Sequence, residues 1–177
     1  MDHFEVRDAL DTFRILVDRR EQRTPRASER YKSFGVPFEK VTLNYGDYAA
    51  CVSIDDIPIY DTSKAIKPVC VIERKMSLDE LASCFTRSRE RFRKEMERAT
   101  ASGCTVYLLV ENGSYEAILG HRYRSRFSPN AFLASLLAWS VRYGLKVIFC
   151  KSDISGTLIR EILFRDMKER LENGEYG

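Results

Sequence analysis

The segment from Pro68 to Lys75, PVCVIERK, constrains the fold of this chain more than any other stretch. Its apolar residues run almost without interruption and end abruptly in three charged side chains. An apolar run of this length, bounded by polar residues, is typical of a strand that is buried on both faces of a sheet. We therefore predict a central strand that carries Glu73, Arg74 and Lys75 to the edge of a sheet.

Other apolar stretches predict the remaining strands of this sheet. Strands are expected at residues 14–18, 38–43, 48–54, 105–111 and 145–150. The second and third of these are expected to form a hairpin around the turn residues Asn44 and Gly46.

Helical spacing of apolar residues predicts helices in the second half of the chain. Ser77 and Glu80 have the spacing of a capping box, from which one helix is expected to run to about residue 101. Further helices are expected at the start of 114–126, ahead of a basic loop, and at 128–143 and 154–171. An antiparallel start followed by alternating strands and helices predicts an α/β fold, in which a mixed β-sheet is flanked by α-helices.

Length and composition favour a single globular domain. The chain has 177 residues, of which 44% are hydrophobic and 31% charged, and its net charge is only +3. We expect one domain over 1–177 with its core at about 13–171. The apolar runs are too short to span a bilayer and the N-terminus lacks a secretory pattern, which predicts a cytoplasmic protein without a membrane partner.

The cysteines argue against a disulfide framework and against structural zinc. They are five in number and widely spaced, and the chain contains no CxxC pair. We expect reduced, buried thiols and no zinc site.

The charged end of the 68–75 strand has the composition of a catalytic site. Residues two apart on a strand point to the same face, so Glu73 and Lys75 share one face and Arg74 points to the other. Asp47, at the start of a neighbouring strand, can supply a second carboxylate. Two carboxylates are hard oxygen ligands that hold Mg²⁺ while water and phosphate oxygens complete its shell.

Each of these fragments also has an ordinary structural interpretation. A carboxylate and a lysine two apart on a strand commonly form a solvated pair, and Asp47 after Gly46 suits a simple turn. The conjunction of a GD turn, an apolar strand ending in ERK and a capped helix, in this order, favours the catalytic interpretation.

Three ordered motifs resemble one nuclease family. The residues ERKMSLD at 73–79, GDY at 46–48 and VDRRE at 17–21 look like signatures of the XPF/Mus-type structure-specific nucleases. The resemblance implies a restriction-endonuclease-like fold and an enzyme that cuts DNA with the help of Mg²⁺ or Mn²⁺. It implies that the catalytic set is Asp47, Glu73 and Lys75. It also implies metal ligation by Asp47, Glu73 and Asp18, and support of the site by Asp18, Glu21, Arg74 and Asp79.

Two departures from the family pattern limit what the resemblance implies. Glu73 follows Asp47 by 26 positions, which suggests a longer connection than the short family hairpin. No helix-hairpin-helix domain is expected within 177 residues, so the chain looks similar to compact, single-domain members from bacteria and phages. The expected substrate is branched or otherwise structured DNA, in replication, recombination or DNA repair.

Basic residues suggest where DNA would lie. A basic stripe at helical spacing follows the site and could contact DNA phosphates: Arg87, Arg91, Lys94 and Arg98. Glutamates lie among these residues, so the alternative is a surface helix whose charges form ion pairs with one another. The other expected DNA contacts are Arg20 and, in the basic loop, Arg122 and Arg124. The apolar helix at 130–143 is interpreted as a buried central helix or as part of an interface, and a homodimer is expected.

Two other functions remain open from the sequence. One is a non-catalytic DNA-binding module of the same fold, which an intact Asp47, Glu73 and Lys75 set disfavours. The other is a metal-dependent nuclease that acts on RNA, which the sequence does not exclude.

Overall fold

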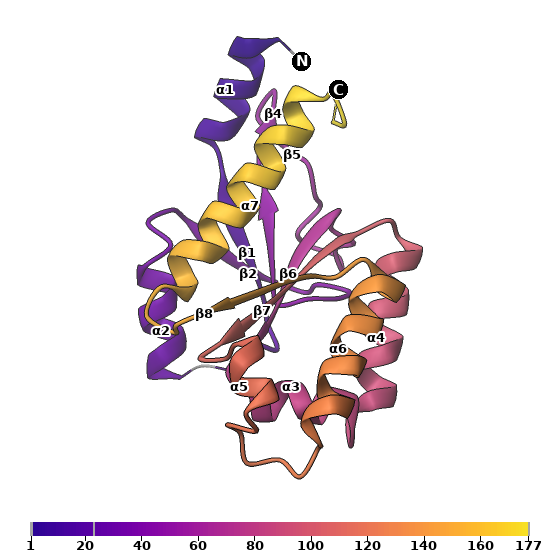
Figure 1. The fold of residues 1–177 in the computed structure, drawn as a ribbon. Helices are drawn as coiled ribbons and strands as arrows, with labels where there is room; N and C mark the ends of the chain where they lie inside the picture. The colour runs from indigo at the N-terminus through magenta and orange to yellow at the C-terminus, as the bar shows by residue number, and fades with distance from the viewer. Residues whose placement is uncertain (1, 23, 177) are drawn as a thin grey trace.

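A computed structural model describes residues 2–22 and 24–176 of the chain. A six-stranded mixed sheet forms its centre, in the order β2-β1-β3-β6-β7-β8 (Figure 1). The strands of this sheet are β1 (Arg14–Asp18), β2 (Phe38–Val41), β3 (Tyr48–Cys51), β6 (Cys70–Lys75), β7 (Thr105–Glu111) and β8 (Lys146–Cys150). A separate two-stranded pair consists of β4 (Ser53–Ile54) and β5 (Ile57–Pro58). The predicted α/β fold with a mixed sheet between helices is confirmed.

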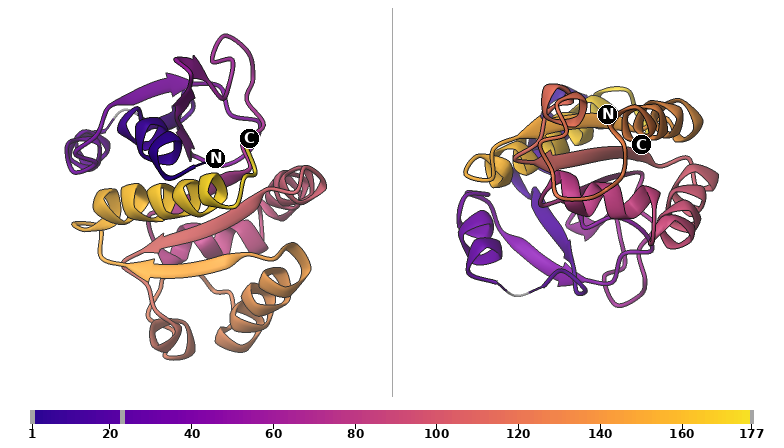
Figure 2. Two further views of the ribbon diagram at one scale, coloured as in Figure 1. Left: turned by 90° about the horizontal axis from the view of Figure 1, so that it is seen from above. Right: turned by 60° about the horizontal axis from the view of Figure 1, so that its bottom comes forward.

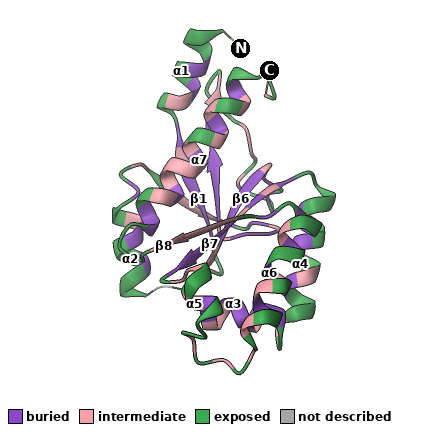
Figure 3. Cartoon of the chain, in the orientation of Figure 1, coloured by how far each residue is buried: buried purple, intermediate pink, exposed green. Residues whose placement is uncertain are grey.

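Helices cover both faces of the sheet, as the two further views show (Figure 2). One face carries α1 (His3–Asp11), α2 (Pro25–Lys32) and α7 (Ser155–Glu172). The other carries α3 (Leu78–Phe85), α4 (Arg89–Ala101), α5 (Tyr115–Leu119) and α6 (Pro129–Tyr143). The central strands are therefore buried on both sides, whereas the helices keep exposed outer surfaces (Figure 3).

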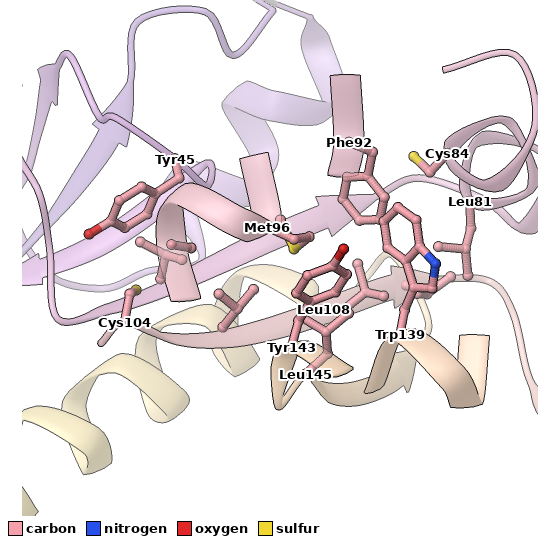
Figure 4. Close-up of a cluster of buried hydrophobic side chains, with 14 of the residues drawn as sticks. Tyr45, Leu81, Cys84, Phe92, Met96, Cys104, Leu108, Trp139, Tyr143 and Leu145 are labelled. Carbon is pink, nitrogen blue, oxygen red and sulfur yellow. The ribbon is translucent and has the colours of Figure 1, made fainter. Parts of the chain in front are cut away.

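Aromatic residues fill the core beneath α4 and α6 (Figure 4). The rings of Phe92 and Trp139 stack with their centroids 5.2 Å apart, and Tyr143 packs edge-on against the same Trp139. Pairs of this kind stabilise a core beyond the apolar area that they bury. Phe92 reaches the edge of the sheet, where its ring lies 5.3 Å from the ammonium group of Lys75.

The strand directions bring the polar ends of four strands to one edge of the sheet. β3 is antiparallel to both β1 and β6, and β7 is parallel to β6. The residue that precedes β3, Asp47, therefore lies beside the last residues of the other strands, Asp18, Lys75 and Glu111. The backbone N–H of Asp18 donates to Asp47 O (2.9 Å), and that of Asp47 donates to Ile72 O (2.9 Å).

Two of the predicted elements are wrong in their pairing or extent. The segments at 38–43 and 48–54 do not form a hairpin, because β1 lies between β2 and β3 and pairs with both. The single helix expected over 77–101 is two helices, α3 and α4. The hydroxyl of Thr86 donates to Ala82 O (2.9 Å) where the chain changes direction.

The capping box at the start of α3 is only half formed. Ser77 accepts a hydrogen bond from the backbone N–H of Glu80, whereas the Glu80 carboxylate accepts from Met76 N rather than from Ser77 N.

The helix at 130–143 is not a buried central helix. α6 buries Phe132, Leu136 and Trp139 but leaves Val141 87% and Leu137 48% exposed. α1 was not expected from the sequence. Four of the five free cysteines are buried, and Cys150 is partly buried. None of the described helices is both long and apolar enough to cross a membrane.

Candidate active site

A cavity of about 480 Å³ opens at the edge of the sheet where the strand ends meet. Charged and polar side chains dominate its lining. The predicted site residues that line it are Asp18, Arg20, Glu21, Asp47, Glu73, Arg74, Lys75, Arg91 and Arg98. The predicted residues outside its lining are Asp79, Arg87, Lys94, Arg122 and Arg124.

Glu73 and Lys75 face each other inside this cavity, as the strand alternation predicted. Both side chains are buried, and Lys75 Nζ lies 2.5 Å from Glu73 Oε1. Burial lowers the pKa of Lys75, but the Glu73 and Asp47 carboxylates outweigh it and hold that pKa above its usual value. Lys75 therefore stays a cation at neutral pH.

The Gly46 turn presents Asp47 to the same cavity. Gly46 has φ +73°, and a Cβ at this position would lie 2.6 Å from Val71 Cβ, so the turn requires glycine. Asp47 Oδ2 accepts a hydrogen bond from Arg74 N (2.8 Å). Burial and the nearby Glu73 carboxylate raise the pKa of Asp47 well above its usual value.

Glu95, on α4, is a third carboxylate at the site that the sequence analysis missed. It lines the cavity, and its Oε1 accepts a hydrogen bond from Gly46 N (3.1 Å). Burial and the Glu73 charge raise its pKa, and Glu95 has no ion-pair partner among the described residues. Its helical spacing was the available signal, because Glu95 lies beside the buried Phe92 and Met96.

Asp18 lies at the cavity with its carboxylate oxygens already engaged. Oδ1 accepts from the backbone N (2.8 Å) and Nε (2.7 Å) of Arg20, and Oδ2 accepts from Arg20 Nη2 (3.1 Å) and Leu43 N (2.8 Å). Arg20 also donates to Leu43 O (2.9 Å). The pair thus ties the end of β1 to the segment after β2.

Arg74 points away from Glu73, into a network of paired charges that forms another wall of the cavity. Its guanidinium donates to Glu21 (3.1 Å) and Glu111 (3.2 Å). Arg30, which the sequence analysis did not single out, donates to the same two carboxylates at 2.8 and 3.3 Å. Tyr48 completes the network through hydrogen bonds with Glu21 and Arg30.

The basic residues around α4 do not form the single stripe that was expected. Arg91 and Arg98 line the cavity, and neither forms an ion pair among the described residues. Arg87 lies in the break between α3 and α4, where its Nε donates to Ser83 Oγ (3.0 Å). Lys94 lies 3.7 Å from Glu90 on the exposed side of the helix.

The donors at the cavity fit a hard divalent cation. Within residues 2–22 and 24–176, no group of three or more His, Cys, Asp or Glu side chains is arranged to hold a metal ion. The Glu73 carboxylate nevertheless lies close enough to Asp47 to disfavour the charged form of Asp47. A cation such as Mg²⁺ takes one or two carboxylates and keeps several waters, which suits this pair.

Comparisons with known proteins identify a matching family and similar solved structures. A family model described as the ERCC4 domain matches residues 17–159. A structure of XPF from Aeropyrum pernix has a TM-score of 0.60 and 24% identity, over 92% of this chain and 69% of that one. A second structure of that protein, in complex with DNA, has a TM-score of 0.59 and 26% identity, over 89% of this chain and 66% of that one.

No curated protein matches the chain in sequence. The family match nevertheless spans well over half of the chain and includes Asp47 and the strand that carries Glu73 and Lys75. On that evidence the protein belongs to the ERCC4 domain family.

Proposed function

We propose that this protein is a metal-dependent endonuclease that hydrolyses phosphodiester bonds in branched or otherwise structured DNA. The observation that carries the proposal is the convergence of Asp47, Glu73 and Lys75 in one charged cavity at the edge of the sheet. Membership of the ERCC4 domain family supports it. The protein would act in the cytoplasm, where a microbial chromosome or a mobile element lies.

In this proposal Asp47 and Glu73 hold Mg²⁺ or Mn²⁺. When bound, the ion supplies an activated water and neutralises charge on the scissile phosphate. Lys75 lines the same cavity beside these two carboxylates. It would stabilise the negative charge that develops on the phosphate oxygens, from a position fixed by its contact with Glu73.

The surrounding charges divide between positioning the site and binding the substrate. We assign Asp18 to positioning, because its oxygens already accept four hydrogen bonds. Glu21 and Arg74 position the end of β6 through the paired network. Arg91 and Arg98, together with Arg26 at the start of α2, line the cavity and would bind the phosphates on either side of the cut.

The preference for structured DNA rests on similarity to a longer protein. This chain spans about two thirds of the Aeropyrum pernix XPF chains that it resembles. One of those structures is a complex with DNA, which favours DNA over RNA as the substrate here.

Cleavage of end-labelled duplex, single-stranded, flap, fork and four-way-junction DNA, with matched RNA, tests the proposal. Cutting should require Mg²⁺ or Mn²⁺ and should be lost in Glu73→Gln, which keeps the size of the side chain. A Glu97→Gln variant serves as the matched control, since Glu97 lies on the exposed side of α4. Equal cutting by wild type and Glu73→Gln, or DNA binding without any cutting, would overturn the proposal.

We further propose that the protein forms a homodimer. α5 and α6 are in contact, and they expose the apolar side chains of Leu119, Leu137 and Val141, which a second copy of the chain could cover. Light scattering after gel filtration should give a dimer at micromolar concentration, and Val141→Glu should give monomers. A monomeric wild-type protein would contradict this.

A further inference from the structure

Asp79 is the last residue of the ERKMSLD motif, yet its carboxylate is directed to a loop rather than to the cavity. It lies in the first turn of α3, and its Oδ1 accepts hydrogen bonds from two consecutive backbone groups, Arg124 N and Ser125 N, both at 2.8 Å. Hydrogen bonds to an ionised acceptor are about twice as strong as neutral ones. Asp79 thus ties the loop between α5 and α6 to the helix that follows Lys75.

The loop itself, residues 120–126, has a defined shape. His121 Nε2 lies 2.9 Å from Ser125 O, and the hydroxyl of Tyr123 donates to Phe127 O (2.7 Å). The ring of Tyr123 packs edge-on against Phe132 in α6. These contacts hold the ends and the middle of the loop, while Asp79 fixes the two N–H groups between them.

The same loop carries three exposed arginines, Arg122, Arg124 and Arg126. In the part of the chain that the structure describes, none of them forms an ion pair. The loop and α3 lie at the same, lower end of the molecule in Figure 1. A rigid loop with several unpaired guanidinium groups matches the spaced negative charges of a nucleic-acid backbone.

We propose that Asp79 is a positioning residue. It holds loop 120–126 in the shape of a phosphate-binding surface, which contacts the DNA duplex away from the bond that is cut. This rests on the proposed nuclease function and assigns Asp79 to substrate binding rather than to catalysis. The carboxylate is outside the lining of the cavity, and its accepting oxygen is committed to the loop. Removing it frees the loop and disperses the three charges.

The test begins with DNA binding in EDTA, where no cleavage can occur, measured by fluorescence anisotropy of a labelled duplex at several salt concentrations. Asp79→Ala should raise the Kd roughly tenfold and reduce the salt dependence, because each lost phosphate contact removes about 0.9 from the slope. Asp79→Asn should restore wild-type binding to within about twofold, since its amide oxygen can accept the same two hydrogen bonds.

A double-mutant cycle links the effect to the loop. Replacing Arg122, Arg124 and Arg126 together by alanine should weaken binding at least as much as Asp79→Ala does, and adding Asp79→Ala to these three changes should have little further effect. Hydrogen exchange at the amides of Arg124 and Ser125 should be faster in Asp79→Ala. Asp153→Asn, which removes an exposed carboxylate ahead of α7, is the control and should bind like wild type.

Cleavage at saturating DNA separates this role from a catalytic one. The kcat of Asp79→Ala should stay within about threefold of wild type while its KM rises with the Kd. A large loss of kcat with unchanged Kd would overturn the inference and return Asp79 to catalysis, as would additive effects in the cycle. Failure of the wild-type protein to bind DNA at all would instead overturn the proposed function.

Discussion

Two sets of charged side chains line the same cavity and differ in how their charges are balanced. In the first set, Arg30 and Arg74 face Glu21 and Glu111, two cations against two anions, and every member has a partner. The second set places the carboxylates of Asp47, Glu73 and Glu95 around a single ammonium group, that of Lys75. Arg74, between Glu73 and Lys75 in sequence, belongs to the balanced set because a strand alternates its faces.

This difference in charge balance suggests that the first set stabilises the fold and that the second set carries the activity. A buried charge is tolerated when it is paired and hydrogen-bonded, as in the set around Arg74. An excess of carboxylates, of which Glu73 is buried and Asp47 and Glu95 are partly buried, is unfavourable in the free protein and becomes favourable when a cation binds. Substitutions in the balanced set should therefore lower stability, whereas substitutions in the unbalanced set should lower activity without lowering the stability of the metal-free protein.

The largest expected effect is on the unbalanced side, at Lys75. Lys75→Met should lower kcat about 100- to 1,000-fold, because it removes the ammonium group that lies beside Glu73 and would stabilise charge on the phosphate. Single-turnover cleavage of the preferred DNA measures this. Lys64→Met is the control, since Lys64 is exposed and pairs only with Asp61. Retention of wild-type kcat in Lys75→Met would show that the unbalanced set does not carry the chemistry.

The second effect is on the balanced side, at Glu111. Glu111→Ala should lower the free energy of unfolding by about 3 kcal/mol, because it leaves Arg30 and Arg74 largely buried without one of their two carboxylates. Urea unfolding followed by circular dichroism measures the loss. Glu97→Ala, which breaks an exposed pair with Arg93, should change stability little. Equal stability of the two variants would mean that the balanced set is not a scaffold.

The third effect tests whether Glu95 belongs to the unbalanced set through its hydrogen bond or through its charge. Glu95→Ala loses both and should lower kcat about tenfold, because the Gly46 turn that presents Asp47 loses its contact with α4. Glu95→Gln keeps an acceptor for Gly46 N and should recover most of that loss. Similar defects in Ala and Gln variants would assign the role to the charge, and a wild-type kcat in both would remove Glu95 from the site.

How much of this arrangement the sequence predicts depends on how local the signal is. The β6 strand and its charged end were predicted, because an apolar run and a strict alternation of faces are contained within eight residues. The β2–β3 hairpin was wrong, because the partner of each strand is β1, which lies outside the segment that the turn residues describe. The break after α3 was missed because it contains no glycine or proline that would indicate the end of a helix. There the hydroxyl of Thr86 donates to Ala82 O.

In the candidate site, too, the sequence predicted the residues that belong to local motifs and missed those that meet across long stretches of chain. Asp47, Glu73 and Lys75 come from motifs whose order could be recognised along the chain. Arg30 and Glu111 meet across 81 positions and Glu95 meets Gly46 across 49, distances at which only the fold decides which side chains face each other. Each of the three was therefore found only once the strands and helices were placed.

The smallest expected effect is a gain in stability when Asp47, in the unbalanced set, loses its charge. This effect distinguishes the two sets of charges most clearly. Burial and Glu73 raise the pKa of Asp47, so the folded protein binds a proton at this group more readily than the unfolded chain does. Stability from this group is then present below the unfolded pKa of about 3.9 and is lost as pH rises through the folded value. Asp47→Asn should stabilise the metal-free protein by about 1 kcal/mol at neutral pH, and by almost nothing near pH 4.

Thermal unfolding of wild type and Asp47→Asn in EDTA, at several pH values, measures this difference while effects common to both proteins cancel. Adding Mg²⁺ should reverse the order at neutral pH, because the ion binds folded wild type and stabilises it by mass action, whereas the asparagine variant has lost a carboxylate ligand. A balanced charge gives no such gain when removed, so the same substitution at Glu111, Glu111→Gln, should destabilise at neutral pH with or without the metal. If Asp47→Asn were destabilising in EDTA, the carboxylates of the cavity would already be compensated by the protein itself, and the distinction between the two sets would fail.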